Sequence, residues 1–413
     1  MKTLLYRLLV LLVPITFFSP AHAQSIDDLF NSEQAKDQEA IENERDTKTE
    51  KKHPSGEPAQ FQFNDSAGRT YSLDMMAAVD TVLEWDKNTP HSTDNKYYVR
   101  TGEFGFYAAI DHLAEGVLTF AAHDEGGELM AEVHEAYLQM PGTLIPRTTI
   151  RLGKMFPQAG RLNGIHQHDW AFVTAPIVHE KLLDYEGILD TGAEFSFLMP
   201  WPFWQELTIG AFNGRTFGHA HDDGEQKNNP LFNGRLKQFF PLGDRWGTQF
   251  GFSYLRWHPE TVSTKVSHQY GFDFLLKYKR GKLASFQWQT EAWYRETRMK
   301  NERKLDPPAD PVETHAGTYT FIEWQPFEQW AFGARYDYYM TPTLRESNQY
   351  TGLDQTKKNG LEEVSMIVTF RPSEFSFFRG QASTRVDFET GIRTWQYYLQ
   401  ATFILGKHPA HLY

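Results

Sequence analysis

The chain has 413 residues, a formal net charge of −12, an aromatic content of 15% and no cysteine. The negative charge disfavours nucleic acid as a partner, and the absence of cysteine excludes disulfides and thiolate metal sites. A mean hydropathy of −0.55 argues against a helical membrane protein but is compatible with membrane-spanning strands, in which half of the residues face water.

Residues 1–23 have the layout of a secretory signal peptide. Lys2 and Arg7 give a positive start, residues 8–18 form an apolar segment, and Ala21-His22-Ala23 matches a small-x-small cleavage site. The apolar segment is too short to span about 30 Å of hydrocarbon. We therefore predict export of the chain.

Residues 24–69 differ in composition from the rest of the chain. The part from 31 to 52 is charged and nearly free of large apolar residues, and Pro54-Ser55-Gly56 follows it. This composition predicts a short disordered or helical periplasmic arm. The arm is either a solvated linker or a segment that contacts another protein.

After the arm, apolar and polar residues alternate with a period of two. In the segment 329–340, for example, Trp330 and Phe332 alternate with Arg335 and Asp337 on the other face. Aromatic residues on one face and charges on the other are typical of a barrel with lipid outside and water inside. The predicted strands are 70–85, 97–111, 115–124, 128–138, 147–156, 188–199, 205–214, 229–240, 245–257, 267–280, 283–296, 315–326, 329–340, 361–372, 375–387 and 394–406.

These segments predict an all-β fold, a transmembrane antiparallel β-barrel of about 16 strands, with a range of 14–18 when one pair is misassigned. Residues 70–413 form this domain. Short connections with turn residues, such as 241–244 and 281–282, alternate with longer polar ones. Short periplasmic turns and longer outer loops are typical of barrels in the outer membrane of a Gram-negative bacterium, which is the predicted location.

The longest connection, the external loop 157–187, is unusually apolar and contains Trp170, Phe172, Ile177 and Leu182. Water penalises exposed apolar residues, so we expect this loop to fold into the barrel mouth or to pack on its rim. It is either a constriction loop or a lid on the rim.

Inward-facing positions of the predicted strands carry charges of both signs. A barrel of about 16 strands is wide enough for water unless something fills it. The mixed signs predict no strong ion selectivity, and the alternative is that the charges pair and hold the interior together. The predicted pore-lining residues are Arg147, Arg151, Glu291, Arg295, Arg335, Asp337, Arg385 and Asp387.

Three histidine pairs are candidate metal ligands. Imidazole with carboxylate suits zinc, nickel or copper, and the two pairs in external loops lie on the same side of the membrane. One site with four ligands is therefore geometrically allowed, whereas the alternative is incidental surface histidine. The candidate ligands are His166, His168 and Asp169, then His219, His221 and Asp222, and finally His408 and His411.

Several blocks resemble, in the same order, a set of proteobacterial outer-membrane barrels described as zinc-regulated outer-membrane receptors, some of them as TonB-dependent. The blocks are 151–156, 160–163, 166–173, 186–193, 334–338, 371–376 and 405–411. The resemblance extends from about residue 128 to the C-terminus. It implies an outer-membrane barrel whose expression or cargo involves zinc, with the family's histidine motifs at His166, His168, His408 and His411.

The chain departs from a plugged TonB-dependent receptor. Such receptors use about 22 strands around a plugged lumen, and the arm 24–69 is too short and too polar for a globular plug. TonB is therefore not an expected partner. A charged arm before about 16 strands is also similar to phosphate-selective porins.

The sequence leaves two main functions open. One is a porin-like channel that admits small hydrophilic solutes, including zinc or metal chelates, and the alternative is a loop-closed metal-binding receptor barrel without conduction. An enzyme is not expected, because Ser253, Ser267 and His268 form no nucleophile–base–orienter pattern. Expected partners are outer-membrane lipid, lipopolysaccharide, the barrel-assembly machinery and small solutes or metal ions, and the short turn 125–127 favours a monomer.

Overall fold

The computed structural model describes residues 60–64, 70–86, 96–109, 113–125, 128–142, 144–214, 230–258, 265–280, 284–299, 312–346, 349–350, 360–373 and 375–406. These residues are mostly strand, together with a short 3-10 helix, η1 (Gln167–Asp169), and one helical turn and a half, α2 (Ile177–Leu182). Among them, no helix has the length and apolar character needed to cross a membrane.

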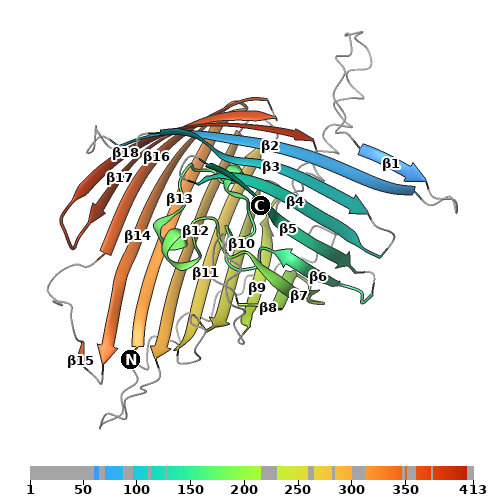
Figure 1. Ribbon diagram of the computed structural model, residues 1–413, viewed down its shortest axis with the longest axis horizontal. Helices are drawn as coiled ribbons and strands as arrows, with labels where there is room; N and C mark the ends of the chain where they lie inside the picture. The colour runs from blue at the N-terminus through green and yellow to red at the C-terminus, as the bar shows by residue number, and fades with distance from the viewer. Residues whose placement is uncertain are drawn as a thin grey trace.

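Sixteen long antiparallel strands form a closed barrel (Figure 1). Each strand pairs with the next along the chain, and β18 pairs back with β2 from Gln396↔Asp86 to Gly406↔Met76. Closure leaves no unpaired sheet edge, which is what a strand protein in lipid requires. The strands are β2 (Thr70–Asp86), β3 (Lys96–Ala109), β4 (Glu115–Glu125), β5 (Glu128–Pro141), β6 (Thr148–Met155), β7 (Asp190–Leu198), β8 (Trp204–Phe212), β9 (Leu231–Leu242), β10 (Trp246–Trp257), β11 (Lys265–Arg280), β12 (Ala284–Met299), β13 (Val312–Phe327), β14 (Trp330–Glu346), β16 (Gly360–Ser373), β17 (Ser376–Asp387) and β18 (Arg393–Gly406).

The predicted fold class and strand count are confirmed, and every predicted strand has its counterpart. The boundaries differ by a few residues, most at the loop ends of β13 and β14, which are longer than predicted. β6 begins one residue later than expected because Arg147 has a φ of 66°, a left-handed conformation that ends an extended segment.

Two short strands complete the sheet. β1 (Gln60–Asn64) lies in the range assigned to the arm and pairs with the start of β2, from Gln60↔Asp74 to Asn64↔Thr70. It therefore continues the wall beyond the point where β18 ends. β15 (Gln349–Tyr350) pairs with the end of β14. Residues 1–59, and with them the predicted signal peptide and most of the arm, lie outside the described part.

The two faces of the barrel wall differ as the alternation predicts. On β14, Arg335 and Asp337 are buried, whereas Trp330, Phe332 and Tyr336 are exposed. Large aromatic residues are exposed near both ends of the strands, as in the aromatic girdles of outer-membrane barrels. Those near the short turns include Trp201, Phe203, Trp246, Trp324, Phe327, Trp330 and Phe375, and those near the opposite ends include Trp85, Tyr97, Tyr270 and Trp395.

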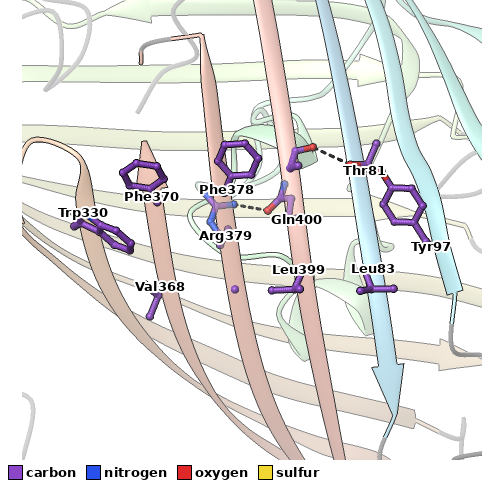
Figure 2. Close-up of a pocket in the computed structure, with 12 residues that line it drawn as sticks. Thr81, Leu83, Tyr97, Trp330, Val368, Phe370, Phe378, Arg379, Leu399 and Gln400 are labelled. Carbon is purple, nitrogen blue, oxygen red and sulfur yellow. Dashed lines mark hydrogen bonds between the residues drawn. The ribbon is translucent and has the colours of Figure 1, made fainter. Parts of the chain in front are cut away.

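A groove of about 530 Å³ crosses the outer wall over β14, β16–β18, β2 and β3 (Figure 2). Gly380 lies between Val368 and Leu399 on the neighbouring strands, and a Cβ there would meet only Leu399, at 3.7 Å. Leu399 and Phe378 are among the exposed apolar residues of the outer face. The groove therefore faces the lipid side and is not the candidate functional site.

Candidate functional site in the barrel lumen

The connection between β6 and β7, residues 156–189, lies inside the barrel, where Figure 1 draws it in green within the curve of the sheet. We call it the lumen loop. Three of its backbone N–H groups donate hydrogen bonds to wall side chains on three strands: Gly160 to Ser253 on β10 (2.9 Å), Val173 to Gln381 on β17 (2.7 Å) and Ile177 to Asp337 on β14 (3.0 Å). Of the two predicted arrangements, a constriction loop and a lid on the rim, these contacts match the first.

The apolar residues of the lumen loop form a hydrophobic core inside the lumen. Trp170 and Phe172 are almost completely buried, and the ring centroid of Phe172 lies 5.4 Å from that of Phe321 and 6.0 Å from that of Tyr319. Other members of the core include Ile177, Leu182 and Leu183 from the loop and Leu255, Trp257, Trp293 and Tyr339 from the wall. This packing explains why a connection between two membrane strands is so apolar.

A glycine on β13 gives the loop room to approach the wall. A Cβ at Gly317 would lie 2.8 Å from a side-chain carbon of Val178 in α2, which is closer than real contacts allow. Any larger residue at this position would push α2 away from the sheet.

Arg335, a predicted pore-lining residue, holds the loop through a buried charge network. Its guanidinium pairs with Asp337 at 2.7 Å and with Glu363 at 3.0 Å, and it also donates to the carbonyl oxygen of Thr174. The guanidinium carbon lies 4.6 Å from the ring centroid of Phe172. A buried cation with two carboxylates and a carbonyl is fully compensated, so it fixes the loop geometry at this point.

Other predicted pore-lining residues also contact the loop. Arg295 donates to the carbonyl oxygen of Leu182, and Glu291 accepts hydrogen bonds from the backbone N–H groups of Arg161 and Leu162. Arg385 pairs with Glu363 at 2.8 Å and with Glu180 of α2 at 3.4 Å, and Arg151 pairs with Glu194, which accepts the Gln158 N–H at 2.8 Å. Their charges are therefore used to anchor the loop.

The structure places Arg147 in the turn before β6 and Asp387 at the last residue of β17, next to a turn. Arg147 donates to the carbonyl oxygens of Leu198 (3.0 Å) and Met199 (2.8 Å) at the short-turn end of β7. Asp387 accepts hydrogen bonds from the N–H groups of Glu389 (2.8 Å) and Thr390 (3.4 Å). Alternation does not extend into a turn, so it cannot place Arg147 on the wall. Asp387 is still on its strand, but its carboxylate binds the turn that follows.

Histidine and carboxylate side chains gather where the lumen loop meets β3, β4 and β5. Two carboxylates hold His166 from opposite sides: Nδ1 lies 2.8 Å from Oε2 of Glu103, and Nε2 lies 3.0 Å from Oε2 of Glu135. The members of this group, which we call the His–Glu cluster, are Glu103, His123, His134, Glu135, His166, His168 and Glu186.

A β-bulge gives the cluster its central residue. In the β4–β5 pairing, Thr119 lies opposite Glu135 and Phe120 opposite Val133, so His134 is the extra residue on β5. As a result His134 and Glu135, although adjacent in sequence, are both buried, whereas Val133 is exposed. Without the bulge, one of the two side chains would face lipid.

A second bulge lies on β3. Asp80 is opposite Thr101 and Thr81 is opposite Val99, so Arg100 is the extra residue. Arg100 pairs with Asp80 and donates to the carbonyl oxygen of Val173 in the lumen loop. The Thr101 hydroxyl lies 3.3 Å from Nδ1 of His123, so this bulge also positions a neighbour of the cluster.

Two overlapping sets of three residues in the cluster have the spacing of potential metal ligands. One is Glu103, His134 and His166, and the other is His123, His134 and Glu186, with the ligand atoms of each set within 4.8 Å of one another. The ring centroid of His134 lies 5.1 Å from that of His166 and 5.7 Å from that of His123. His134 is thus shared by both sets.

Of the predicted metal ligands, His166 and His168 lie in the cluster. His168 is 3.7 Å from Glu103 and 3.6 Å from Asp169, which joins the edge of the group. His219, His221, Asp222, His408 and His411 lie outside the described residues, and so does the predicted shared site of the two external pairs. Sequence reasoning missed Glu103, His123, His134, Glu135 and Glu186, although the break in alternation at 133–136 was a visible signal.

The two buried histidines of the loop have opposite electrostatic surroundings. Burial alone would lower the pKa of His166, but Glu103 and Glu135 raise it well above its ordinary value, which favours the charged imidazolium. Burial lowers the pKa of His179 in α2 to about 3, and the Asp184 backbone opposes this shift only in part. His166 therefore faces an anionic environment and His179 an apolar one.

The serine and histidine considered as hydrolase candidates have structural partners. The Ser253 hydroxyl accepts the hydrogen bond from Gly160 of the lumen loop. Ser267 lies 2.8 Å from Thr297, and Nδ1 of His268 lies 2.8 Å from the hydroxyl of Tyr254 on the neighbouring strand. Each of the three side chains thus has a hydrogen-bond partner in the fold.

No family model matches the sequence. A protein of Aquifex aeolicus (strain VF5), described only as uncharacterized, is 25% identical over 335 residues, which are 75% of this chain and 68% of that protein. The resemblance to zinc-regulated receptors thus stays a prediction.

Solved structures of outer-membrane proteins are similar in fold. OmpT of Vibrio cholerae has a TM-score of 0.52 at 10% identity, over 81% of this chain and 97% of that chain. An anion-selective porin from Comamonas acidovorans has a TM-score of 0.51 at 10% identity, over 81% and 100%. The outer-membrane channel DcaP of Acinetobacter baumannii has a TM-score of 0.52 at 10% identity, over 83% and 99%. The chain therefore has a porin-like barrel fold.

Proposed function

We propose that the protein is an outer-membrane channel with a narrowed lumen, which admits small hydrophilic solutes, including divalent metal ions or their small chelates. The observation that carries the proposal is the position of the lumen loop, which is anchored to strands on different sides of a porin-like barrel. A barrel of about 16 strands is wide enough for water. A loop fixed across it reduces the cross-section and thereby limits the size of solute.

The paired charges bear on selectivity. Arg335, Arg385 and Arg151 each have a carboxylate partner, so the lumen wall presents ion pairs rather than a ring of one sign. Rings of a single charge sign are what gives a pore strong ion selectivity. The proposal is therefore a channel that discriminates by size more than by charge.

A second candidate function is a loop-closed barrel that binds metal without conducting. The apolar packing of the lumen loop against Tyr319 and Phe321 favours it, because a dry interface excludes water and ions from that part of the lumen. The two candidates differ in one measurable property, the passage of ions.

The surroundings proposed for either function are those of an outer-membrane protein. They comprise the outer-membrane lipid and lipopolysaccharide around the apolar wall, and the barrel-assembly machinery during insertion. The fold relatives with functional names are porins and a channel, so we propose transport and no catalysis. TonB is not a proposed partner.

Single-channel conductance of the refolded mature chain in a planar bilayer tests the proposal. The wild type should give small steps, and Arg295→Met combined with Arg335→Met should give larger ones, because both arginines hold carbonyl groups of the loop. Arg298→Met is the matched control, since Arg298 on β12 is two-thirds exposed and pairs only with Glu296 among the contacts found in the described residues. A wild type without steps would contradict the channel and favour the closed barrel.

A further inference from the structure

We infer that the His–Glu cluster binds a divalent transition-metal ion, with Glu103, His134 and His166 as its ligands. The inference deepens the proposed function by naming a class of solute that the lumen recognises. Metal binding does not itself require conduction, so the two can fail separately. Imidazole with carboxylate and no thiolate is a donor set suited to zinc, nickel or copper.

The three ligand residues come from separate segments that the fold brings together. Glu103 lies on β3, His134 on β5 and His166 in the lumen loop, and all three are buried. Zinc–ligand bonds of about 2.0–2.1 Å place tetrahedral ligands about 3.3 Å apart. The ligand atoms here lie between 2.8 Å (His166 to Glu103) and 4.8 Å apart, so small side-chain movements suffice to form the site.

Neighbouring groups orient the ligands as outer partners do in metal sites. The second ring nitrogen of His166 is 3.0 Å from Glu135, which leaves Nδ1 directed at Glu103. Histidine ligands commonly use their other ring nitrogen in this way, and the carboxylate partner strengthens the imidazole as a ligand. The bulge that turns both His134 and Glu135 inward supplies a ligand and this partner from adjacent residues.

An independent observation also points to a cation. The Oε1 atom of Glu103 is buried and has no hydrogen-bond partner among the described residues. A buried carboxylate oxygen without a partner has lost its hydration and gained nothing in return, which is unfavourable. A metal ion bound by Glu103 would supply the missing positive partner.

The second set, His123, His134 and Glu186, lies beside the first and shares His134. His123 and His134 are 3.6 Å and 3.7 Å from the two oxygens of Glu186, which belongs to the lumen loop. An ion held by the first set would therefore lie next to further donors along the lumen wall. Closely spaced weak sites are what allows an ion to enter and leave a pore.

Zinc titration of the full mature chain, refolded in detergent and free of affinity tags, tests the inference. The titrations use isothermal calorimetry in a background where His219, His221, His408 and His411 are Ala, so that these pairs do not contribute. We expect one zinc equivalent per chain, with affinity reduced at least about tenfold by His134→Gln and by Glu103→Gln.

His315→Gln is the matched control, because His315 is also a partly buried histidine on a barrel strand, β13, and pairs with Glu313 away from the cluster. Its zinc affinity should equal that of the background. Heat-modifiable mobility on a gel shows whether each variant has folded. The two test variants lie on different strands, so if one does not fold, the zinc affinity of the other still tests the site. X-ray absorption of the bound zinc should show imidazole and oxygen ligands, and this measurement needs no variant.

No zinc binding in the background, or equal affinity in both test variants and the control, would overturn the inference and leave a network of hydrogen bonds that only tethers the loop. Zinc binding with the expected losses but no conductance would support the metal site and contradict the channel. Conductance without zinc binding would support the channel and contradict the metal site.

Discussion

The lumen loop meets the barrel wall on two sides that differ in chemistry. Toward β13, Phe172 packs on Tyr319 and Phe321 in an apolar contact. Toward β3 and β5, His166 lies between Glu103 and Glu135 in a polar contact. One segment is thus held by hydrophobic packing on one side and by ionisable groups on the other.

The two sides of the loop therefore have different roles, since one holds the loop in place and the other carries ionisable groups. Apolar packing is non-directional and depends little on ions, so it can keep the loop in place under varied conditions. Histidine and carboxylate contacts change with protonation and with metal. The polar side is therefore where a bound ion or proton can act, while the apolar side keeps the site assembled.

The largest effect on release of the lumen loop should come from a substitution on the apolar side. Phe172→Ala removes a fully buried ring, and such a substitution costs about 3–5 kcal/mol. Release of the loop should become at least about a hundredfold more frequent, measured as trypsin cleavage after Lys181, which lies in α2. Phe332→Ala, on the exposed face of β14, is the control and should cleave like the wild type. Equal cleavage of both variants would mean that the apolar contact does not hold the loop.

The polar side should contribute less to the free energy that holds the lumen loop in place. Glu103→Gln replaces the charged partner of His166 with a neutral one, at a cost of about 1–3 kcal/mol. Cleavage after Lys181 should therefore rise by about tenfold without metal. Glu296→Gln, which removes the charged partner of the exposed Arg298 on β12, should leave it unchanged. A larger increase for Glu103→Gln than for Phe172→Ala would reverse the assignment of the two sides.

The smallest effect concerns pH and His179, on the apolar side. Burial lowers its pKa to about 3 in the inserted loop, from 6.5 when exposed. A released loop therefore takes up the proton first, so the contribution of neutral His179 is complete above pH 6.5 and is lost progressively as the pH falls toward 3. Release of the loop widens the pore, so the conductance of the wild type should increase as the pH falls from 6.5 to 4. His179→Leu should make this increase smaller, and His268→Leu on β11 is the control. Superimposable pH curves for His179→Leu and wild type would contradict this expectation.

Much of the barrel could be predicted because its pattern is local. Alternation of residues such as Trp330, Phe332, Arg335 and Asp337 follows from a lipid face and an interior face on each strand, and the turns have recognisable residues. The same rule failed at His134 and Arg100. A bulge inserts one residue into one strand, and only the pairing with the neighbouring strand shows that the register has shifted.

The sequence alone therefore determined the class, the number of strands, the two faces of the wall and the unusual apolar character of the loop between β6 and β7. Each of these depends on residues near one another in the chain. Only the tertiary structure decided where the loop goes, which charges hold it and which histidines meet. Glu103, His134 and His166 are separated along the chain, and it is the pairing of β3, β4 and β5 together with the inserted loop that brings them within ligand distance.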